Sequence, residues 1–347
     1  MNSALSQSEK LALVTNLGTM ITAGIPILEA VDSILEDARG SQKRILEVLR
    51  QDLTEGKTIA STFEKFPRAF DKVSTNIVRA AEEAGTLGTA FKDLSQNIKR
   101  EIEMSEKIRA AMIYPALVAI VFFAVMIIIL TFVIPRVGNV FNRLRINLPL
   151  PTRILVATSG FILGYWPFII IGFAALFIAI ILLYRAKKLF ITSIFFSLPL
   201  VSNLVREIDL TRFTRSMALL LASGIPITES LELSQNVVNK KEIAKTIAQS
   251  KDKVLSGRKL SDGLKTSKKI IPPLMIHLIE AGEKSGTLEK SMQELSEYFD
   301  LRVSNSLKNI ATLIEPALLL VIGLLVGGVM LAIIAPIYQL IGQIRTR

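Results

Sequence analysis

Two short motifs occur twice in this chain, about 200 residues apart. The first is AGIPILEA at residues 23–30, which returns as SGIPITES at residues 223–230. The second is EEAGTL at residues 82–87, which returns as EKSGTL at residues 283–288. A period this long predicts two copies of one structural unit, so the two halves of the chain should share one fold.

Three long stretches of the chain carry no charged residue. They lie between Arg109 and Arg136, between Arg153 and Arg185, and between Glu315 and Arg345. Each is longer than the roughly 20 residues that cross the hydrocarbon core of a bilayer. Each is also too apolar on all sides for the core helix of a soluble protein. We therefore predict an integral membrane protein with three transmembrane helices.

The repeat includes the first and third stretches, because a shift of 201 carries Pro115 onto Pro316. Each unit is therefore a soluble domain followed by a span. The second stretch has no copy in the repeat. Both domains can lie on one side of the membrane only if this stretch crosses it and returns the chain to that side. An inverted-repeat transporter would instead place its two halves in opposite orientations. The predicted order is a soluble domain at 1–111, a span at 112–135, an outer loop at 136–153, a second span at 154–184, the second domain at 185–311, a third span at 312–340 and an outer tail at 341–347.

The soluble units show the apolar periodicity of α-helices and almost none of the alternation typical of strands. Gly24 stands where a helix would end, and Pro26 stands where the next would begin. In the first unit we predict helices over residues 8–23, 26–38, 41–55, 58–66 and 71–84, and a sixth from residue 87 into the membrane. The predicted fold class is an all-α membrane protein with two repeated six-helix-bundle cytoplasmic domains and three transmembrane helices.

The amino-terminal sequence lacks the basic region, apolar stretch and cleavage site of a signal peptide. A long charged domain without a signal is expected to stay in the cytoplasm, although the charges that flank the first span do not favour either side. Residues 1–111 carry 15 Lys and Arg against 16 Asp and Glu, whereas residues 185–311 carry 20 against 13. The basic second domain can contact anionic lipid or an acidic protein, or can simply be solvated. Nucleic acid is not expected as a partner, because no recognition motif accompanies the basic residues.

No catalytic, cofactor or metal site is predicted. Gly56, Lys57 and Thr58 resemble the end of a phosphate-binding loop, but the first glycine of such a loop would fall at position 51, which is Gln. The chain has no cysteine and one histidine, which argues against thiolate metal sites and His-based catalytic triads.

Two kinds of residue stand in unfavourable helical positions. Four carboxylates, Glu82, Glu83, Glu280 and Glu283, lie in the last turn of a predicted helix, where the helix dipole disfavours them. A cation, a basic partner or solvent should offset the repulsion. Pro115 and Pro316 each remove a backbone hydrogen bond and are predicted to kink or start a transmembrane helix.

These paired motifs, each leading into an apolar helix with Pro-Ala-Leu, resemble the type II secretion system F family. The resemblance extends from about residue 10 to residue 337. Members often carry a further stretch before the first unit, so any partner contact made by that stretch is in question here. The residues that match the family motifs are Gly24, Pro26, Glu83, Gly85 and Thr86, and Gly224, Pro226, Glu283, Gly286 and Thr287; we interpret most of them as structural caps.

The resemblance implies a non-enzymatic platform in the bacterial plasma membrane, multi-pass, with a cytoplasmic amino terminus. Such a platform couples a cytoplasmic hexameric ATPase to the extrusion of pilin or pseudopilin subunits in type IV pilus assembly or type II protein secretion. The implied partners are this assembly or retraction ATPase, the subunits, other inner-membrane assembly proteins, the lipid bilayer and further copies of the chain, as a dimer or higher oligomer. No cofactor is implied. Lys265, Lys268 and Lys269, in a basic connector, are the residues that we predict to contact the ATPase.

Two other functions are open to a membrane protein with soluble domains. A small-solute transporter would need ionisable residues along a pathway within the spans, and the three uncharged stretches do not supply them. A membrane receptor or signalling adaptor is compatible with two all-α domains. A neighbouring gene for a hexameric secretion ATPase would favour the platform over both.

Overall fold

The computed structural model describes residues 3–143, 152–165, 167–168, 199–267 and 270–345. All regular structure within these ranges is helical. The chain forms two compact units. We call Met1–Lys107 with Ser202–Ser306 the soluble unit, and Ile108–Val201 with Leu307–Arg347 the membrane unit.

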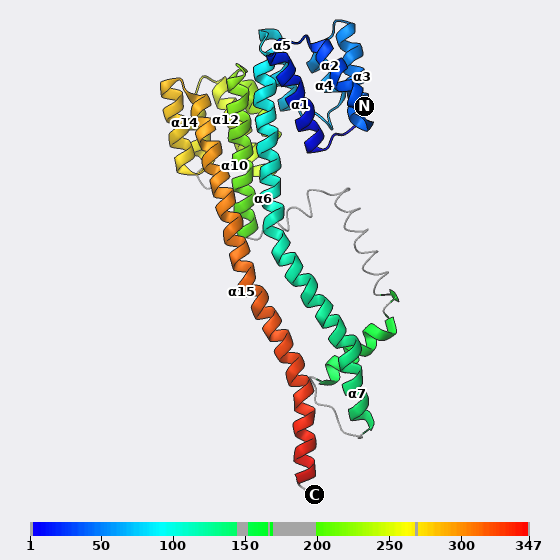
Figure 1. The fold of residues 1–347 in the computed structure, drawn as a ribbon. Coiled ribbons are helices and arrows are strands. Elements are labelled where there is room, and N and C mark those ends of the chain that lie inside the picture. Colours follow the sequence, from blue (N-terminus) through cyan, green and yellow to red (C-terminus); the bar gives the residue numbers. More distant parts are fainter. Residues whose placement is uncertain (1–2, 144–151, 166, 169–198, 268–269, 346–347) are drawn as a thin grey trace. The chain divides into compact units, whose positions relative to one another are not determined.

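The first repeat supplies six helices in the predicted order. They are α1 (Gln7–Thr22), α2 (Ile27–Asp37), α3 (Gly40–Thr54), α4 (Ile59–Lys65), α5 (Lys72–Ala84) and α6 (Leu87–Ile128) (Figure 1). Every predicted helix end in this repeat is confirmed to within one residue. The boundaries follow from local chemistry: Ser6 and Glu9 form a capping box at the start of α1, and Gly24 follows its end with a positive φ of 85°.

The second repeat forms the same succession of helices. It consists of α10 (Pro199–Ala222), α11 (Ile227–Gln235), α12 (Lys241–Leu255), α13 (Leu260–Leu264) with the short 3-10 turn η2 (Lys265–Ser267), α14 (Pro273–Ser285) and α15 (Leu288–Arg345). Consecutive helices from α1 to α5 pack against each other, as do those from α11 to α14. The predicted repeated helical domains are thereby confirmed.

Each repeat has its own apolar core. In the first, Phe63, Phe70 and Phe91 are buried, and Gly18 of α1 allows α6 to approach so closely that an added Cβ would lie 2.9 Å from the Cβ of Phe91. In the second, Phe213 of α10 and Phe299 of α15 belong to one buried cluster. Burial of each such side chain contributes about 1.5–3 kcal/mol, which makes these cores the main source of domain stability.

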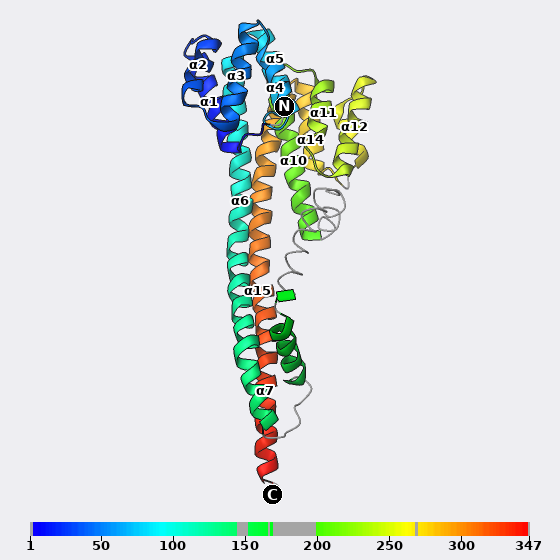
Figure 2. The same ribbon diagram turned by 90° about the vertical axis from the view of Figure 1, so that its right-hand side faces the viewer.

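Within the soluble unit, α6, α10 and α15 lie side by side in both views (Figures 1 and 2). Side chains of the second repeat also complete the first core: Leu220, Ile225 and Leu233 are buried in the same apolar cluster as Phe63 and Phe91. The two domains therefore share a continuous apolar contact.

In the membrane unit, α6 continues through the π-helical turn η1 (Ile129–Val133) into α7 (Ile134–Arg143). A π turn leaves a backbone carbonyl without its usual helical partner. The hydroxyl of Ser159, in the helical segment 152–165, donates to the carbonyl of Leu130 at 2.5 Å. Because a bilayer core offers no water, this bond stabilises the contact between the two segments.

Two helices of the described residues are long and apolar enough to cross a membrane; they contain the first predicted span and residues 312–331 of the third. Most of the predicted second span, residues 169–184, lies outside the described residues. The first part of the outer loop predicted at 136–153 is helical, because α7 extends to Arg143. Pro115 and Pro316 lie inside α6 and α15, so neither starts a helix, and the predicted kinks stay predictions.

Candidate functional site

The EEAGTL and EKSGTL motifs form the sharp turns between α5 and α6 and between α14 and α15. Gly85 and Gly286 both have a φ of 72°, a left-handed conformation that glycine adopts without a steric penalty. The next amide bonds back into the preceding helix, from Thr86 N–H to the Ala81 carbonyl at 2.8 Å in the first repeat. These bonds are typical of a helix-ending Schellman turn. Each turn therefore sets the direction in which α6 or α15 leaves its domain.

A carboxylate just before each turn ties it to another helix. The two carboxylate oxygens of Glu82 accept from the backbone N–H groups of Ile59 at 2.5 Å and Ala60 at 3.0 Å, at the start of α4. In the second repeat, Glu283 accepts in the same way from Leu260 at 2.5 Å and Ser261 at 3.2 Å, at the start of α13. The first turn of a helix has free N–H donors, so these carboxylates satisfy groups that nothing in the helix can satisfy.

This geometry revises the role expected for Glu83. Its side chain is exposed, and the residue that corresponds to Glu283 in the repeat is Glu82. The shift of 201 that relates Gly85 to Gly286 also relates Glu82 to Glu283, so the repeat itself contained the signal. Neither a cation nor a foreign partner is needed to explain these two carboxylates.

The other motif residues also lie at helix ends. Gly224 has a φ of 77° after α10, as Gly24 has after α1, and Pro26 and Pro226 directly precede α2 and α11. Thr86 and Thr287 directly precede α6 and α15. These positions agree with their interpretation as structural caps.

The fragment that resembles a phosphate-binding loop is the connection between α3 and α4. Thr58 caps α4 by accepting from Ser61 N–H at 3.2 Å. Lys57 binds the carboxylates of Asp52 at 3.2 Å and Glu55 at 2.5 Å. The fragment thus connects two helices, and its lysine forms ion pairs within the domain.

Asp52 is the centre of a buried polar network beside this connection. It is 3% exposed and accepts from the Thr62 hydroxyl at 2.7 Å and from the Lys65 ammonium at 2.5 Å. Burial opposes the charged form, but the hydrogen bonds from Lys65, Thr62 and Lys57 outweigh it and hold the pKa of Asp52 below its ordinary value. The ionised carboxylate therefore stabilises the first domain.

Replacing Asp52 by asparagine should lower the free energy of unfolding of the first domain by about 1–3 kcal/mol at neutral pH. A depressed pKa gives stability that is present above the unfolded pKa of about 3.9 and is lost as the pH falls through the folded value. The wild type should therefore lose more stability than D52N below about pH 4. Melting temperatures of both proteins across this range check the prediction, and parallel curves would contradict it.

Of the predicted ATPase contacts, only Lys265 lies among the described residues; Lys268 and Lys269 are outside them. The Lys265 side chain is 40% exposed and pairs with Glu280 at 3.2 Å and with Asp262 at 3.4 Å. The bonds from Lys284 and Lys265 hold the pKa of Glu280 below its ordinary value. Lys265 is thus accessible to a partner, although acidic residues of its own domain partly neutralise its charge.

The equivalent hairpins α2–α3 and α11–α12 share an ion pair but differ in charge. Arg50 binds Asp32 at 2.6 Å, and the corresponding Lys251 binds Glu232 at 3.1 Å. Three further carboxylates on the first hairpin, Glu36, Glu47 and Glu55, are replaced on the second by Asn236, Ala248 and Ser256. The fold therefore does not require them, and the two domains present different surfaces to partners.

Comparison with known proteins agrees with the duplicated architecture. A family model described as type II secretion system protein F matches the chain twice, at residues 13–135 and 213–336. The chain is 28% identical over 335 residues to the type IV pilus assembly protein PilC of Pseudomonas aeruginosa, which covers 95% of this chain and 89% of that protein. It is 30% identical over 328 residues to the type 4 fimbrial assembly protein PilC of Pseudomonas putida, with 93% and 82% covered. It is also 30% identical over 338 residues to the type II secretion system protein F of Pseudomonas aeruginosa, with 95% and 82% covered.

Proposed function

The chain belongs to the type II secretion system protein F family, and we propose that it is the membrane platform on which pilin or pseudopilin subunits are assembled. It is a membrane component of a type IV pilus or type II secretion system. In the proposal, a cytoplasmic hexameric ATPase supplies the energy and the platform converts its motion into extrusion of subunits. The platform itself hydrolyses no nucleotide.

The observation that carries this proposal is the duplication of one unit, a helical domain whose last helix continues into an apolar span. The family model matches both copies, at residues 13–135 and 213–336. The continuous helices α6 and α15 belong to both the soluble unit and the membrane unit. A helix that runs without interruption from a domain into a span is suited to carry a displacement between them.

In the proposed topology the amino terminus and both domains lie in the cytoplasm, three spans cross the plasma membrane, and the carboxyl terminus lies outside. An odd number of spans follows from the repeat, since two domain-then-span units need one additional crossing to keep the same orientation. We further propose that the platform is a dimer or higher oligomer and contacts other inner-membrane assembly proteins.

We place ATPase docking on the basic second domain, at the connector that contains Lys265, Lys268 and Lys269. Exposed basic residues attract an acidic partner mainly by raising the association rate, which makes the contact sensitive to salt. The α2–α3 and α11–α12 hairpins differ in charge, which supports the proposal that the motor binds one domain in preference to the other.

A charge-reversed connector tests this docking. Because Lys265 pairs with Glu280 and Asp262, it is best replaced by glutamine, with glutamate at positions 268 and 269. We expect the variant to insert normally and to bind the cognate ATPase at least about tenfold more weakly in pull-downs at low salt, a change of about 1.4 kcal/mol. The matched control changes the exposed Lys241 to glutamine, and Lys245 and Lys290 to glutamate. Equal binding by wild type and both variants would contradict the docking site, as would equal loss in both variants.

A further inference from the structure

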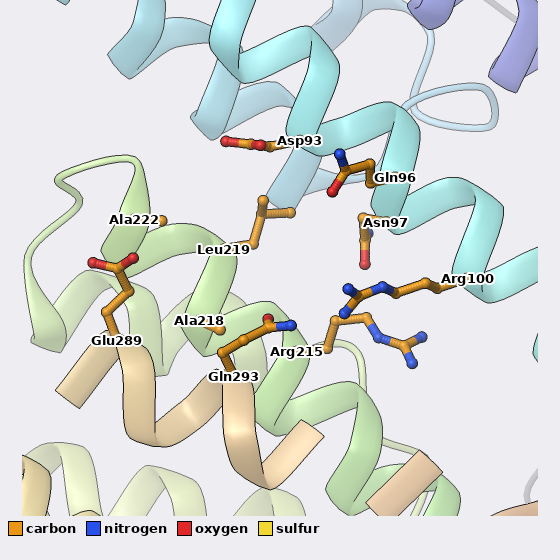
Figure 3. Close-up of a pocket in the computed structure, with 10 residues that line it drawn as sticks. All are labelled: Asp93, Gln96, Asn97, Arg100, Arg215, Ala218, Leu219, Ala222, Glu289 and Gln293. Carbon is orange, nitrogen blue, oxygen red and sulfur yellow. The ribbon is translucent and has the colours of Figure 1, made fainter. Parts of the chain in front are cut away.

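A polar cavity lies where the two repeats meet in the soluble unit. Its volume is about 270 Å³. The walls come from three helices, and the charged and polar residues among them that matter here are Asp93, Asn97 and Arg100 of α6, Arg215 of α10, and Glu289 and Gln293 of α15 (Figure 3). Both repeats therefore contribute to it, and a molecule bound here would touch both domains.

Two buried polar atoms at the cavity lack a protein partner. Arg215 is 6% exposed; one terminal nitrogen of its guanidinium bonds Asp300, but its Nε has no hydrogen-bond acceptor among the described residues. The buried Oδ1 of Asn97 likewise has no donor there. Buried groups of this kind are normally satisfied, because an unmade hydrogen bond in the interior is costly.

These polar groups have no buried counterparts in the other copy of the repeat. The residue of the first repeat that corresponds to Arg215 is Thr15, and the residue of the second repeat that corresponds to Asn97 is Tyr298. Arg100 corresponds to Leu301. All three counterparts are exposed, so they form no second copy of this buried contact, and the polar lining is particular to the junction.

The acidic and the basic side chains of the cavity lie in different parts of it. Asn97 and Arg100 extend toward the same region, with the amide of Gln293 facing them, whereas Asp93 and Glu289 lie apart from this group (Figure 3). Arg100 is only loosely compensated by its ion pair with Glu297, in which the two atoms are 4.0 Å apart. A guanidinium presents five N–H donors, so most of those on Arg100 are available to an acceptor.

We propose that this junction is a binding site for a small phosphate-bearing molecule. The anionic oxygens accept from Arg100 and from the Nε of Arg215, while a phosphate hydroxyl donates to the Oδ1 of Asn97. A monophosphate keeps one such proton below about pH 6, and guanidinium groups match the geometry of phosphate oxygens. Sulfate has the same tetrahedral shape and a larger negative charge but no proton to donate, so weaker binding of sulfate would report the hydrogen bond to Asn97 rather than charge. Bound between the repeats, the ligand restrains the two domains relative to each other, a role that goes beyond the platform function and does not depend on it.

The test uses the full chain in detergent at pH 6, with inorganic phosphate, glycerol phosphate or sulfate at one fixed ionic strength. Calorimetry and melting temperature should show binding of either phosphate by wild type, and at least tenfold weaker binding of sulfate. Stronger binding of glycerol phosphate than of inorganic phosphate would assign the site to an organic phosphate, and the reverse order to the free ion.

The variants R100Q and N97A should each weaken phosphate binding at least tenfold and keep the wild-type melting temperature without ligand to within a few degrees. Lys99→Gln removes the same charge from the neighbouring exposed position and should bind as wild type does. Arg215 is left unchanged, because its loss would leave Asp300 without its partner. Phosphate binding no stronger than that of sulfate, or undiminished in R100Q and N97A, would overturn the proposal.

Discussion

Replacing Glu82 or Glu283 by alanine is expected to lower the free energy of unfolding of the domain concerned by about 2–4 kcal/mol, because each carboxylate makes two charge-assisted hydrogen bonds to otherwise free backbone amides. The loss is large for one side chain, since a domain of this size has only about 5–15 kcal/mol of net stability. Each variant should also free the turn that directs α6 or α15 toward the membrane unit.

Hydrogen exchange locates this effect. In Glu82→Ala the amides of Ile59 and Ala60 should lose protection first, while the amides of Leu260 and Ser261 keep theirs; Glu283→Ala should give the reverse. Local loss of protection separates the broken cap from general unfolding.

The chain supplies its own control in Glu83. This residue is next to Glu82, has the same charge and is exposed. Glu83→Ala should change stability by no more than about 0.5 kcal/mol, as is usual for surface positions. If E83A destabilised the first domain as much as E82A, the assignment of the cap to Glu82 would be wrong.

The helices were predictable because local chemistry determines where they end. Glycine at position 24 favours a left-handed φ, and proline at position 26 disfavours continuation of the preceding helix and favours the start of the next. The apolar residues between such signals recur with helical period, so the existence and order of the six helices followed from the sequence.

The contacts that organise the candidate site could not be predicted in this way, because they join residues that are distant in the chain. Arg215 and Asp300, 85 residues apart, pair only after α10 packs on α15. Asp52 is buried with Thr62 and Lys65, yet nothing in the sequence around it distinguishes it from a surface acid. Such partners are determined by tertiary packing rather than by spacing along a helix.

The family motif pairs Glu83 with Glu283, whereas the equivalent hydrogen bonds are made by Glu82 and Glu283. The shift of 201 assigns Lys284 to the position of Glu83, and a lysine cannot accept hydrogen bonds from backbone amides. The internal repeat of the sequence was therefore sufficient to choose Glu82 over Glu83.

The platform function depends most on both domains facing the cytoplasm, where one motor can reach them. The alternative from the same sequence is an inverted arrangement, with the domains on opposite sides of the membrane. The two topologies differ completely in which surface sites a reagent outside the membrane can reach. Because the chain has no cysteine, single cysteines can report on this without background.

The decisive measurement is labelling of single cysteines in spheroplasts with a membrane-impermeant maleimide. The positions are Ser33 on α2 and Ser256 after α12, both exposed, and Asn142 near the end of α7. We predict that Asn142→Cys labels in intact spheroplasts, and that Ser33→Cys and Ser256→Cys label only after the membrane is permeabilised. Labelling of either domain position in intact spheroplasts, with Asn142→Cys protected or not, would contradict the platform topology.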